Sequence, residues 1–247
     1  MGRIALACAI GLAAATTLGH APEMGPGPVS GTAAASLGRV QEAARPAAAL
    51  DERAARFLEQ HRGLWREENV PEADARALHD LIVERRYRRV LEIGTSTGHS
   101  AIWMARALAG TGGRLTTIEI DEARRREALG NFEAAGVAAL VTARRGDARR
   151  LVSRLAGPFD LVFLDADSEW SVGYARALLP RLAPGGALAA HDVTRAKWPG
   201  TVEPVVVGQR EFYRYVTAQP GIGTEFRAGV FVASLLPPTA GTPSSTR

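Results

Sequence analysis

The chain has 247 residues, of which 46% are hydrophobic, and this is enough for one α/β domain of roughly 200 residues with a single core. Its single cysteine, Cys8, excludes an internal disulfide. The net charge of +4 comes almost entirely from arginine, because Lys197 is the only lysine. The arginines alternate with acidic residues and alanine on predicted helices, without an aromatic platform or a groove-reading helix. We therefore interpret them as a solvated surface and expect no nucleic-acid partner.

The amino-terminal segment has the pattern of an export signal. Arg3 precedes an apolar run of small residues that ends at Leu18, and a Gly-His-Ala sequence suited to cleavage follows. We interpret residues 1–21 as a signal peptide or, if uncut, as a membrane anchor, although the run is short for a membrane span. Residues 22–48 are rich in Ala, Gly, Pro and Ser without periodicity, which predicts a flexible linker.

Two helices open the predicted folded domain, which we place at residues 49–236, before a disordered tail at residues 237–247. The first helix has apolar residues at helical spacing, namely Leu50, Ala54, Phe57 and Leu58. The second begins after Pro71 with acidic residues in its first turn, and its apolar face is formed by Leu78, Leu81 and Ile82. We expect both helices to cover a sheet or to roof the site.

A strand, a tight turn and a helix follow. Residues 89–93 form a short apolar run, two glycines lie four positions apart, and apolar residues at helical spacing come next. Gly94 and Gly98 are expected to let the backbone approach a bound molecule, and the start of the helix offers free N–H groups. Glu92 places a carboxylate beside the predicted pocket, which favours a cationic ligand over a pyrophosphate.

Strands and helices alternate regularly beyond this turn. Further strands are predicted at residues 115–118, 140–143, 159–164 and 187–190. This alternation predicts an α/β fold with a doubly wound, mostly parallel sheet, whose ligands bind at the carboxyl ends of the strands. Polar residues gather at those ends, namely Glu92, Glu119, Asp121, Asp147, Asp165, Asp167, His191 and Asp192. Helix capping explains Asp121 and is plausible for Asp147.

Two of these carboxylates indicate a nucleoside ligand. Glu119 ends the second strand, 25 positions after Gly94, where a carboxylate can accept hydrogen bonds from both hydroxyls of a ribose. Asp147 follows the third strand and is placed to meet an adenine amino group. A role for Asp147 as the N-cap of the next helix is equally compatible with the sequence, and both roles can hold.

Five motifs in this order resemble those of the class I S-adenosylmethionine-dependent methyltransferases, and most closely the catechol and caffeoyl-coenzyme A type O-methyltransferases. They are Val-Leu-Glu-Ile-Gly-Thr-Ser-Thr-Gly-His-Ser at 90–100, Thr-Ile-Glu-Ile-Asp at 117–121, Gly-Asp-Ala at 146–148, Phe-Asp-Leu-Val-Phe-Leu-Asp-Ala-Asp at 159–167 and Leu-Ala-Pro-Gly-Gly at 182–186. The similarity covers about residues 71–235. It implies a seven-stranded Rossmann-like sheet, S-adenosylmethionine as cofactor, and methyl transfer to an oxygen of a small-molecule acceptor.

The resemblance also implies roles for individual residues. The turn after the first strand would line the methionine part of the cofactor, Glu119 would hold the ribose, Asp147 and Ala148 would lie near the adenine, and Asp165 would lie between cofactor and acceptor. The complete cofactor-binding set predicted in this way is Glu92, Gly94, Ser96, Gly98, Ser100, Glu119, Asp147, Ala148 and Asp165.

Catalysis in this family uses a divalent metal, usually magnesium, held by an Asp at the position of Asp165 and by an Asp-Asn pair. This chain has His191 and Asp192 at the pair, and Ser168 replaces the family's basic lysine. Two carboxylates and an imidazole can bind a metal, with a preference shifted towards zinc, manganese or iron. We expect Asp165, His191 and Asp192 to be catalytic and to be the metal set. For His191, the roles of general base, metal ligand and structural residue all remain open.

Two other functions compete with methyl transfer. Residues 94–98 match the G-x-S-x-G nucleophile elbow, and Ser96, Asp165 and His191 follow the chain order of an α/β-hydrolase triad. Against this, the residues before Val90 are predicted as helix or linker, and no oxyanion-hole sequence is evident. The missing lysine motivates a third function, a non-catalytic protein that binds S-adenosylmethionine.

Localisation and assembly stay open at this level. The amino terminus favours export or a membrane tether, whereas a cofactor made in the cytoplasm favours that compartment. The sequence is also compatible with a homodimer. The acceptor itself cannot be named from these residues.

Overall fold

The computed structural model describes residues 47–66, 69–193 and 204–237. The predicted signal or anchor at 1–21, residues 22–46 of the predicted linker at 22–48 and residues 238–247 of the predicted tail at 237–247 lie outside the described residues. Residues 47–48 belong to a helix, so the end of the predicted linker is corrected. Within the described residues, no helix is both long and apolar enough to cross a membrane.

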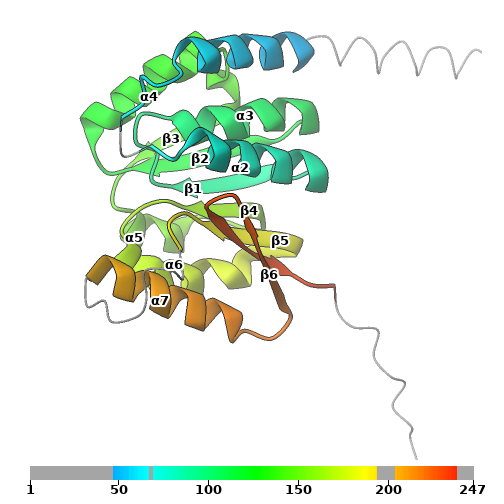
Figure 1. Ribbon diagram of the computed structural model, residues 1–247, viewed down its shortest axis with the longest axis vertical. Coiled ribbons are helices and arrows are strands. Elements are labelled where there is room, and N and C mark those ends of the chain that lie inside the picture. Colours follow the sequence, from blue (N-terminus) through cyan, green and yellow to red (C-terminus); the bar gives the residue numbers. More distant parts are fainter. Residues whose placement is uncertain (1–46, 67–68, 194–203, 238–247) are drawn as a thin grey trace, which may run out of the picture. The chain divides into compact units, whose positions relative to one another are not determined.

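A single seven-stranded sheet organises the fold (Figure 1). Its strands lie in the order β3-β2-β1-β4-β5-β7-β6; the first five are parallel, and β7 runs antiparallel to both of its neighbours. The bounds are β1 Arg89–Ile93, β2 Arg114–Glu119, β3 Val141–Arg145, β4 Phe159–Leu164, β5 Leu182–Ala190, β6 Ile222–Arg227 and β7 Val230–Leu235. The predicted doubly wound, mostly parallel sheet is confirmed.

Two predicted strands have different starts in the structure. The third begins at Val141 because Ala138–Leu140 forms a 3-10 turn. The fifth begins at Leu182 rather than at residue 187, and its pairing with β4 shifts register between Phe159 and Leu161. The Pro-Gly-Gly sequence within it is therefore a bulged strand start, which period-2 alternation alone does not predict.

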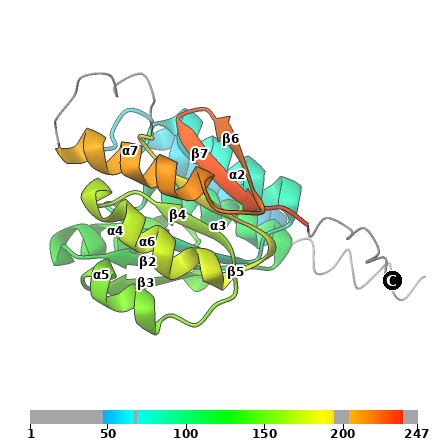
Figure 2. The ribbon, with the colours of Figure 1, turned by 90° about the horizontal axis from the view of Figure 1, so that it is seen from below.

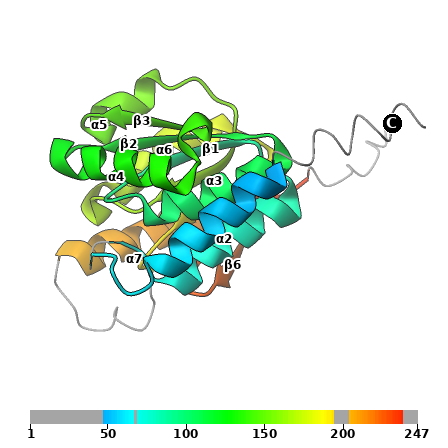
Figure 3. The ribbon, with the colours of Figure 1, turned by 90° about the horizontal axis from the view of Figure 1, so that it is seen from above.

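Helices cover both faces of the sheet. A helix at residues 47–60 lies on one face with α2 Glu72–Arg85, α3 His99–Thr111 and α4 Glu122–Ala135, and Figure 3 shows α2 beside α3. The other face carries α5 Ala148–Leu151, α6 Ser171–Leu178 and α7 Pro204–Thr217, with α6 and α7 side by side in Figure 2. The two predicted amino-terminal helices therefore cover the sheet.

Alternation along the strands divides the core into two layers. In β1, Val90 packs with the α2 and α3 side, whereas Leu91 and Ile93 pack with the α6 and α7 side. The same alternation separates Phe163 from Leu164 in β4, because successive side chains of a strand point to opposite faces. This burial fixes the register of the parallel strands and hence aligns their carboxyl ends.

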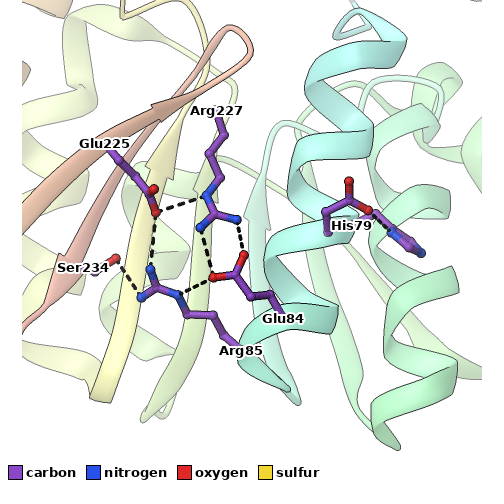
Figure 4. A network of polar contacts seen from close by, with 7 residues as sticks. His79, Glu84, Arg85, Glu225, Arg227 and Ser234 are labelled. Atoms are coloured by element: carbon purple, nitrogen blue, oxygen red, sulfur yellow. Dashed lines mark hydrogen bonds and ion pairs between the residues drawn. The ribbon is translucent and has the colours of Figure 1, made fainter. Parts of the chain in front are cut away.

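An ion-pair network joins the end of α2 to the antiparallel edge (Figure 4). Arg227 of β6 lies 2.6 Å from Glu84 and 3.1 Å from Glu225, and Arg85 lies 3.3 Å from Glu225. Arg85 also donates a hydrogen bond to Ser234 of β7 at 3.3 Å. Charges on an outer strand discourage pairing with another chain, and here they also hold α2 against the sheet.

Candidate active site

The turn after β1 is held by contacts within the protein. Gly94 has φ +97°, and a Cβ there would overlap the backbone carbonyl of Asp165. Gly98 also has φ +97°, and a Cβ there would lie 2.6 Å from the ring of Phe132 on α4. Both glycines are therefore required by close packing of the chain itself. Gly94 lines a cavity, whereas Gly98 packs against α4. The surroundings of Gly98 therefore indicate a packing role rather than the expected close approach to a ligand.

Six predicted residues line one cavity of about 320 Å³ at the carboxyl ends of the strands. We call it the Glu119 cavity, and these six residues are Gly94, Ser96, Glu119, Asp147, Ala148 and Asp165. Its volume falls within the range of about 300–1,000 Å³ that is usual for small-molecule sites. Glu92, Gly98 and Ser100 do not line it.

Glu119 is a buried and firmly oriented carboxylate of this cavity. Its side chain is buried, and its two oxygens accept hydrogen bonds from the backbone N–H groups of Ser96 at 2.8 Å and Asp121 at 2.9 Å. Each oxygen keeps a further lone pair, since a carboxylate has about four acceptor positions. The arrangement can accept hydrogen bonds from two neighbouring hydroxyl groups, as the spacing along the sequence predicted.

Asp147 has the capping role that the sequence allowed, and its position beside the adenine stays a prediction. Its carboxylate accepts a hydrogen bond from the backbone N–H of Arg149 and caps α5, while the residue also lines the Glu119 cavity. A hydrogen bond from the Arg149 side chain, outweighing partial burial, lowers the pKa of Asp147. Asp121 caps α4 by accepting from the backbone N–H of Arg124, as predicted.

Two features of the Glu119 cavity fit a nucleoside-bearing ligand. The Ser96 hydroxyl is buried and has no hydrogen-bond partner among the described residues, although Ser96 lines the cavity. Buried polar atoms are rarely left unpaired, so an unpaired atom at a cavity wall indicates a place for a polar ligand. Ile120, which is 63% exposed, adds an apolar wall suited to a planar base. The residues present therefore fit S-adenosylmethionine.

Glu92 lies fully buried beneath the turn rather than on the wall of the cavity. It accepts hydrogen bonds from the hydroxyls of Ser100 at 2.6 Å and Thr117 at 2.7 Å. Burial raises the pKa of Glu92 to about 8, against the lowering effect of these two bonds. Burial therefore favours the protonated form of Glu92 over the charged carboxylate expected from the sequence.

A second cavity of about 340 Å³ adjoins the first and shares Asp165, Ala166 and Asp167 with it. We call it the His191 cavity. His191 and Asp192 follow β5 and line it, as does Gln209 from α7. The predicted site is thus two neighbouring cavities, with Asp165 in the wall between them.

His191 is held between carboxylates on both sides of its ring. Nε2 lies 3.0 Å from Asp74, and Nδ1 lies 3.3 Å from Asp165 and 3.7 Å from Asp192. Burial lowers the pKa of His191, but the hydrogen bond and charge of Asp165, with the charges of Asp192 and Asp74, outweigh it and raise the pKa. The imidazole is oriented and its protonated form is stabilised.

Asp74 is a site residue that the sequence interpretation missed. It lies on α2, is 5% exposed, and its carboxylate also accepts a hydrogen bond from the backbone N–H of Gly229 at 2.6 Å. A signal was present, because Asp74 shares the buried face of its helix with Leu78 and Leu81, at the helical spacings of four and seven. A carboxylate on an apolar face indicates a buried partner.

The three residues of the predicted metal set, Asp165, His191 and Asp192, lie beside one another. Within the described ranges, no group of three or more His, Cys, Asp or Glu side chains could hold a metal ion. A carboxylate lies beside each ring nitrogen of His191. The Asp192 side chain is 63% exposed. A metal bound by Asp165, His191 and Asp192 therefore stays a prediction.

The structure does not support the hydrolase alternative. Ser96 has the positive φ of a nucleophile elbow, +48°, but its hydroxyl is buried and unpaired in the part of the chain that the structure describes. His191 contacts Asp74, Asp165 and Asp192 instead. A serine nucleophile requires a base within hydrogen-bond reach. The resemblance to a G-x-S-x-G elbow comes from a tight turn of similar shape.

Comparison with known proteins agrees with this geometry. Residues 91–193 match a family model described as a methyltransferase domain. A catechol O-methyltransferase of Niastella koreensis is 37% identical over 142 residues, which cover 55% of this chain and 64% of the relative. The chain therefore spans just under two thirds of the length of this curated relative.

Solved structures extend the match over most of the fold. A crystal structure from Klebsiella pneumoniae, provisionally identified as an O-methyltransferase, is 31% identical with a TM-score of 0.64, covering 75% of this chain and 90% of that chain. The O-methyltransferase TomG of Streptomyces achromogenes, solved in complex with S-adenosylmethionine, is 29% identical with a TM-score of 0.63, with the same two coverages. The chain belongs to the class I S-adenosylmethionine-dependent O-methyltransferase family.

Proposed function

We propose that this chain binds S-adenosylmethionine in the Glu119 cavity and transfers its methyl group to an oxygen of a small-molecule acceptor in the His191 cavity. The observation that carries the proposal is the wall shared by the two cavities, Asp165–Asp167. The Glu119 cavity contains the carboxylate of Glu119, which two backbone N–H groups orient, and the unpaired hydroxyl of Ser96. The His191 cavity contains the imidazole of His191, which Asp74 orients. A transfer reaction needs such adjoining sites for donor and acceptor.

The cofactor side follows from the polar groups of the Glu119 cavity. Glu119 accepts hydrogen bonds from the ribose hydroxyls, and the Ser96 hydroxyl pairs with a polar group of the ligand. Asp147 and Ala148 lie near the adenine. Glu92, Gly98 and Ser100 act from below, by fixing the turn that carries these groups.

The acceptor side depends on His191. When bound, the cofactor supplies a methyl group on a cationic sulfur, so that a C–O bond forms as the C–S bond breaks. Neutral His191 takes the proton of the acceptor hydroxyl at a ring nitrogen, and the carboxylates of Asp74 and Asp165 stabilise the imidazolium that results. Raised basicity makes His191 a stronger base once it is deprotonated.

Methyl transfer to catechol is the direct test, because catechol is the acceptor class named for the Niastella koreensis relative. We expect the purified full chain to methylate catechol from labelled S-adenosylmethionine, with undiminished activity in a chelator. His191→Asn should lower kcat by about 10²–10⁴-fold. Cofactor binding without transfer to catechol or other hydroxyl compounds would contradict an enzymatic role and favour a binding protein. Loss of activity in chelator would contradict catalysis by His191 alone.

Localisation and assembly are separate proposals. We propose that residues 1–21 direct export or attach the chain to a membrane, from the pattern of Arg3 followed by an apolar run. Cell fractionation with amino-terminal sequencing of the mature protein tests this, and a cytoplasmic protein that begins at residue 1 would refute it. Sedimentation of the purified chain tests the expected homodimer.

A further inference from the structure

The His191 cavity has features that restrict the chemistry of its acceptor. We infer that it selects hydroxyl compounds without negative charge, neutral or cationic, and that Gln209 is a specificity-determining residue that accepts a hydrogen bond from them. This inference rests on the proposed function and names the substrate class of the same site. Two independent observations carry it, the charge of the cavity wall and an unpaired buried amide.

The charge of the described cavity wall is strongly negative. Its described lining includes four carboxylates and one imidazole, but no lysine or arginine, and the carboxylates belong to Asp165, Asp167, Glu169 and Asp192. Arg149 lies 3.7 Å from Asp167 but lines the other cavity. Even with His191 protonated, four negative charges face one positive charge. Like charges a few ångströms apart repel, so an anionic group on the acceptor is disfavoured.

Gln209 supplies the second observation. It lies on α7, is 6% exposed and lines the His191 cavity, and its Oε1 has no hydrogen-bond partner among the described residues. A buried amide oxygen without a partner is costly unless a ligand or water supplies a donor. Because an oxygen can only accept, the complementary ligand group is a hydroxyl or an ammonium N–H. A carboxylate cannot donate.

Close packing of the main chain positions the part of α7 that carries Gln209. The neighbouring residue, Gly208, packs so closely that a Cβ would overlap the carbonyl of Ser168 and lie 2.9 Å from the Cα of Glu169. The helix therefore lies directly against Ser168–Trp170, the short turn that contributes to the cavity wall. Main-chain packing thus places the backbone of Gln209 beside the cavity wall. Charge and hydrogen bonding then favour the same ligands.

Three catechols that share one ring and differ in charge provide the test. Calorimetry on the full chain saturated with S-adenosylhomocysteine compares 3,4-dihydroxybenzylamine, 4-methylcatechol and 3,4-dihydroxybenzoate. We expect the benzoate to bind at least about tenfold more weakly than either of the others at low ionic strength. The difference should shrink as salt is added, because screening weakens charge repulsion at a solvent-accessible site.

Variants of Gln209 distinguish the effect of its amide hydrogen bond from the effect of the negative cavity wall. Gln209→Met keeps the side-chain length and should weaken all three catechols by about threefold or more, because each carries ring hydroxyls that can donate to the amide oxygen, while leaving S-adenosylhomocysteine unchanged. Gln209→Glu retains an acceptor and should keep amine binding while weakening the benzoate further. The matched control is Gln219→Met, beyond the end of α7, where the amide bonds to the carbonyl of Tyr215.

The outcomes distinguish the inference from the proposed function. Equal binding of the three catechols by the wild type, tighter binding of the benzoate, or unchanged catechol binding in Gln209→Met would overturn the inference. Normal binding of S-adenosylhomocysteine without binding of any catechol would overturn it as well, while leaving the cofactor site intact. Failure to bind S-adenosylhomocysteine would instead refute the proposed function, and the inference would fall with it.

Discussion

Glu92→Gln is expected to remove a pH-dependent loss of stability from this fold. Glu92 is fully buried, and its pKa is raised from 4.5 to about 8 because burial disfavours the charged form. The folded chain therefore binds more protons than the unfolded chain between these two values. The stability that Glu92 contributes is fully present below the unfolded pKa and is lost as pH rises through the folded pKa.

The magnitude follows from the difference in pKa. With a folded pKa of about 8 and an unfolded value of 4.5, raising the pH from about 5 to 7 costs on the order of 2–3 kcal/mol of unfolding free energy. Glutamine is neutral at both pH values, so the variant lacks this term. It weakens the hydrogen bonds from Ser100 and Thr117 by roughly 1 kcal/mol each, and that loss is independent of pH.

Urea denaturation of the wild type and of Glu92→Gln at about pH 5 and at pH 7 measures this difference directly. The unfolding free energy of the variant should rise relative to that of the wild type as the pH increases. Glu133→Gln, on the exposed surface of α4, is the matched control and should follow the wild type. Parallel pH dependences for the wild type and Glu92→Gln would refute the reasoning about burial.

Two further predictions concern the site. Asp74→Asn removes one of the carboxylates beside His191, so the pKa of His191 should fall. The acid limb of the kcat–pH profile should then move to lower pH. An unmoved limb would show that Asp74 does not act on the imidazole. Gly94→Ala forces a Cβ onto the carbonyl of Asp165 at positive φ, so urea denaturation should show a loss of at least about 1–3 kcal/mol, and wild-type stability would contradict the packing described for this turn.

The sheet and the cofactor side were largely predictable from the sequence. Apolar runs bounded by Gly, Asp and helical stretches predicted the parallel strands, and the carboxyl ends of parallel strands must meet at one edge. Glu119 and Asp147 therefore had to lie close together once the strands were placed. Their hydrogen bonds and the shared cavity agree with that expectation.

Properties that depend on packing between distant elements were not predictable in the same way. Asp74 reaches His191 only because α2 packs across the sheet, a contact between residues 117 positions apart. The carboxylate of Glu92 is buried against hydroxyls from β2 and α3. This burial raises the pKa of Glu92, whereas its residue type alone suggests a charged side chain. For His191, the motif position left the roles of base, metal ligand and structural residue open, and its contacts with Asp74 and Asp165 depend on packing that the motif does not predict.

Titration of the purified full chain with S-adenosylhomocysteine in a calorimeter tests the central claim, that the Glu119 cavity holds the nucleoside of the cofactor. We expect saturable one-site binding for the wild type and for the control Glu133→Gln, and binding at least about tenfold weaker for Glu119→Ala, which loses a charged hydrogen-bond acceptor. Absence of wild-type binding at about millimolar ligand, or equal affinity of Glu119→Ala, would contradict the claim.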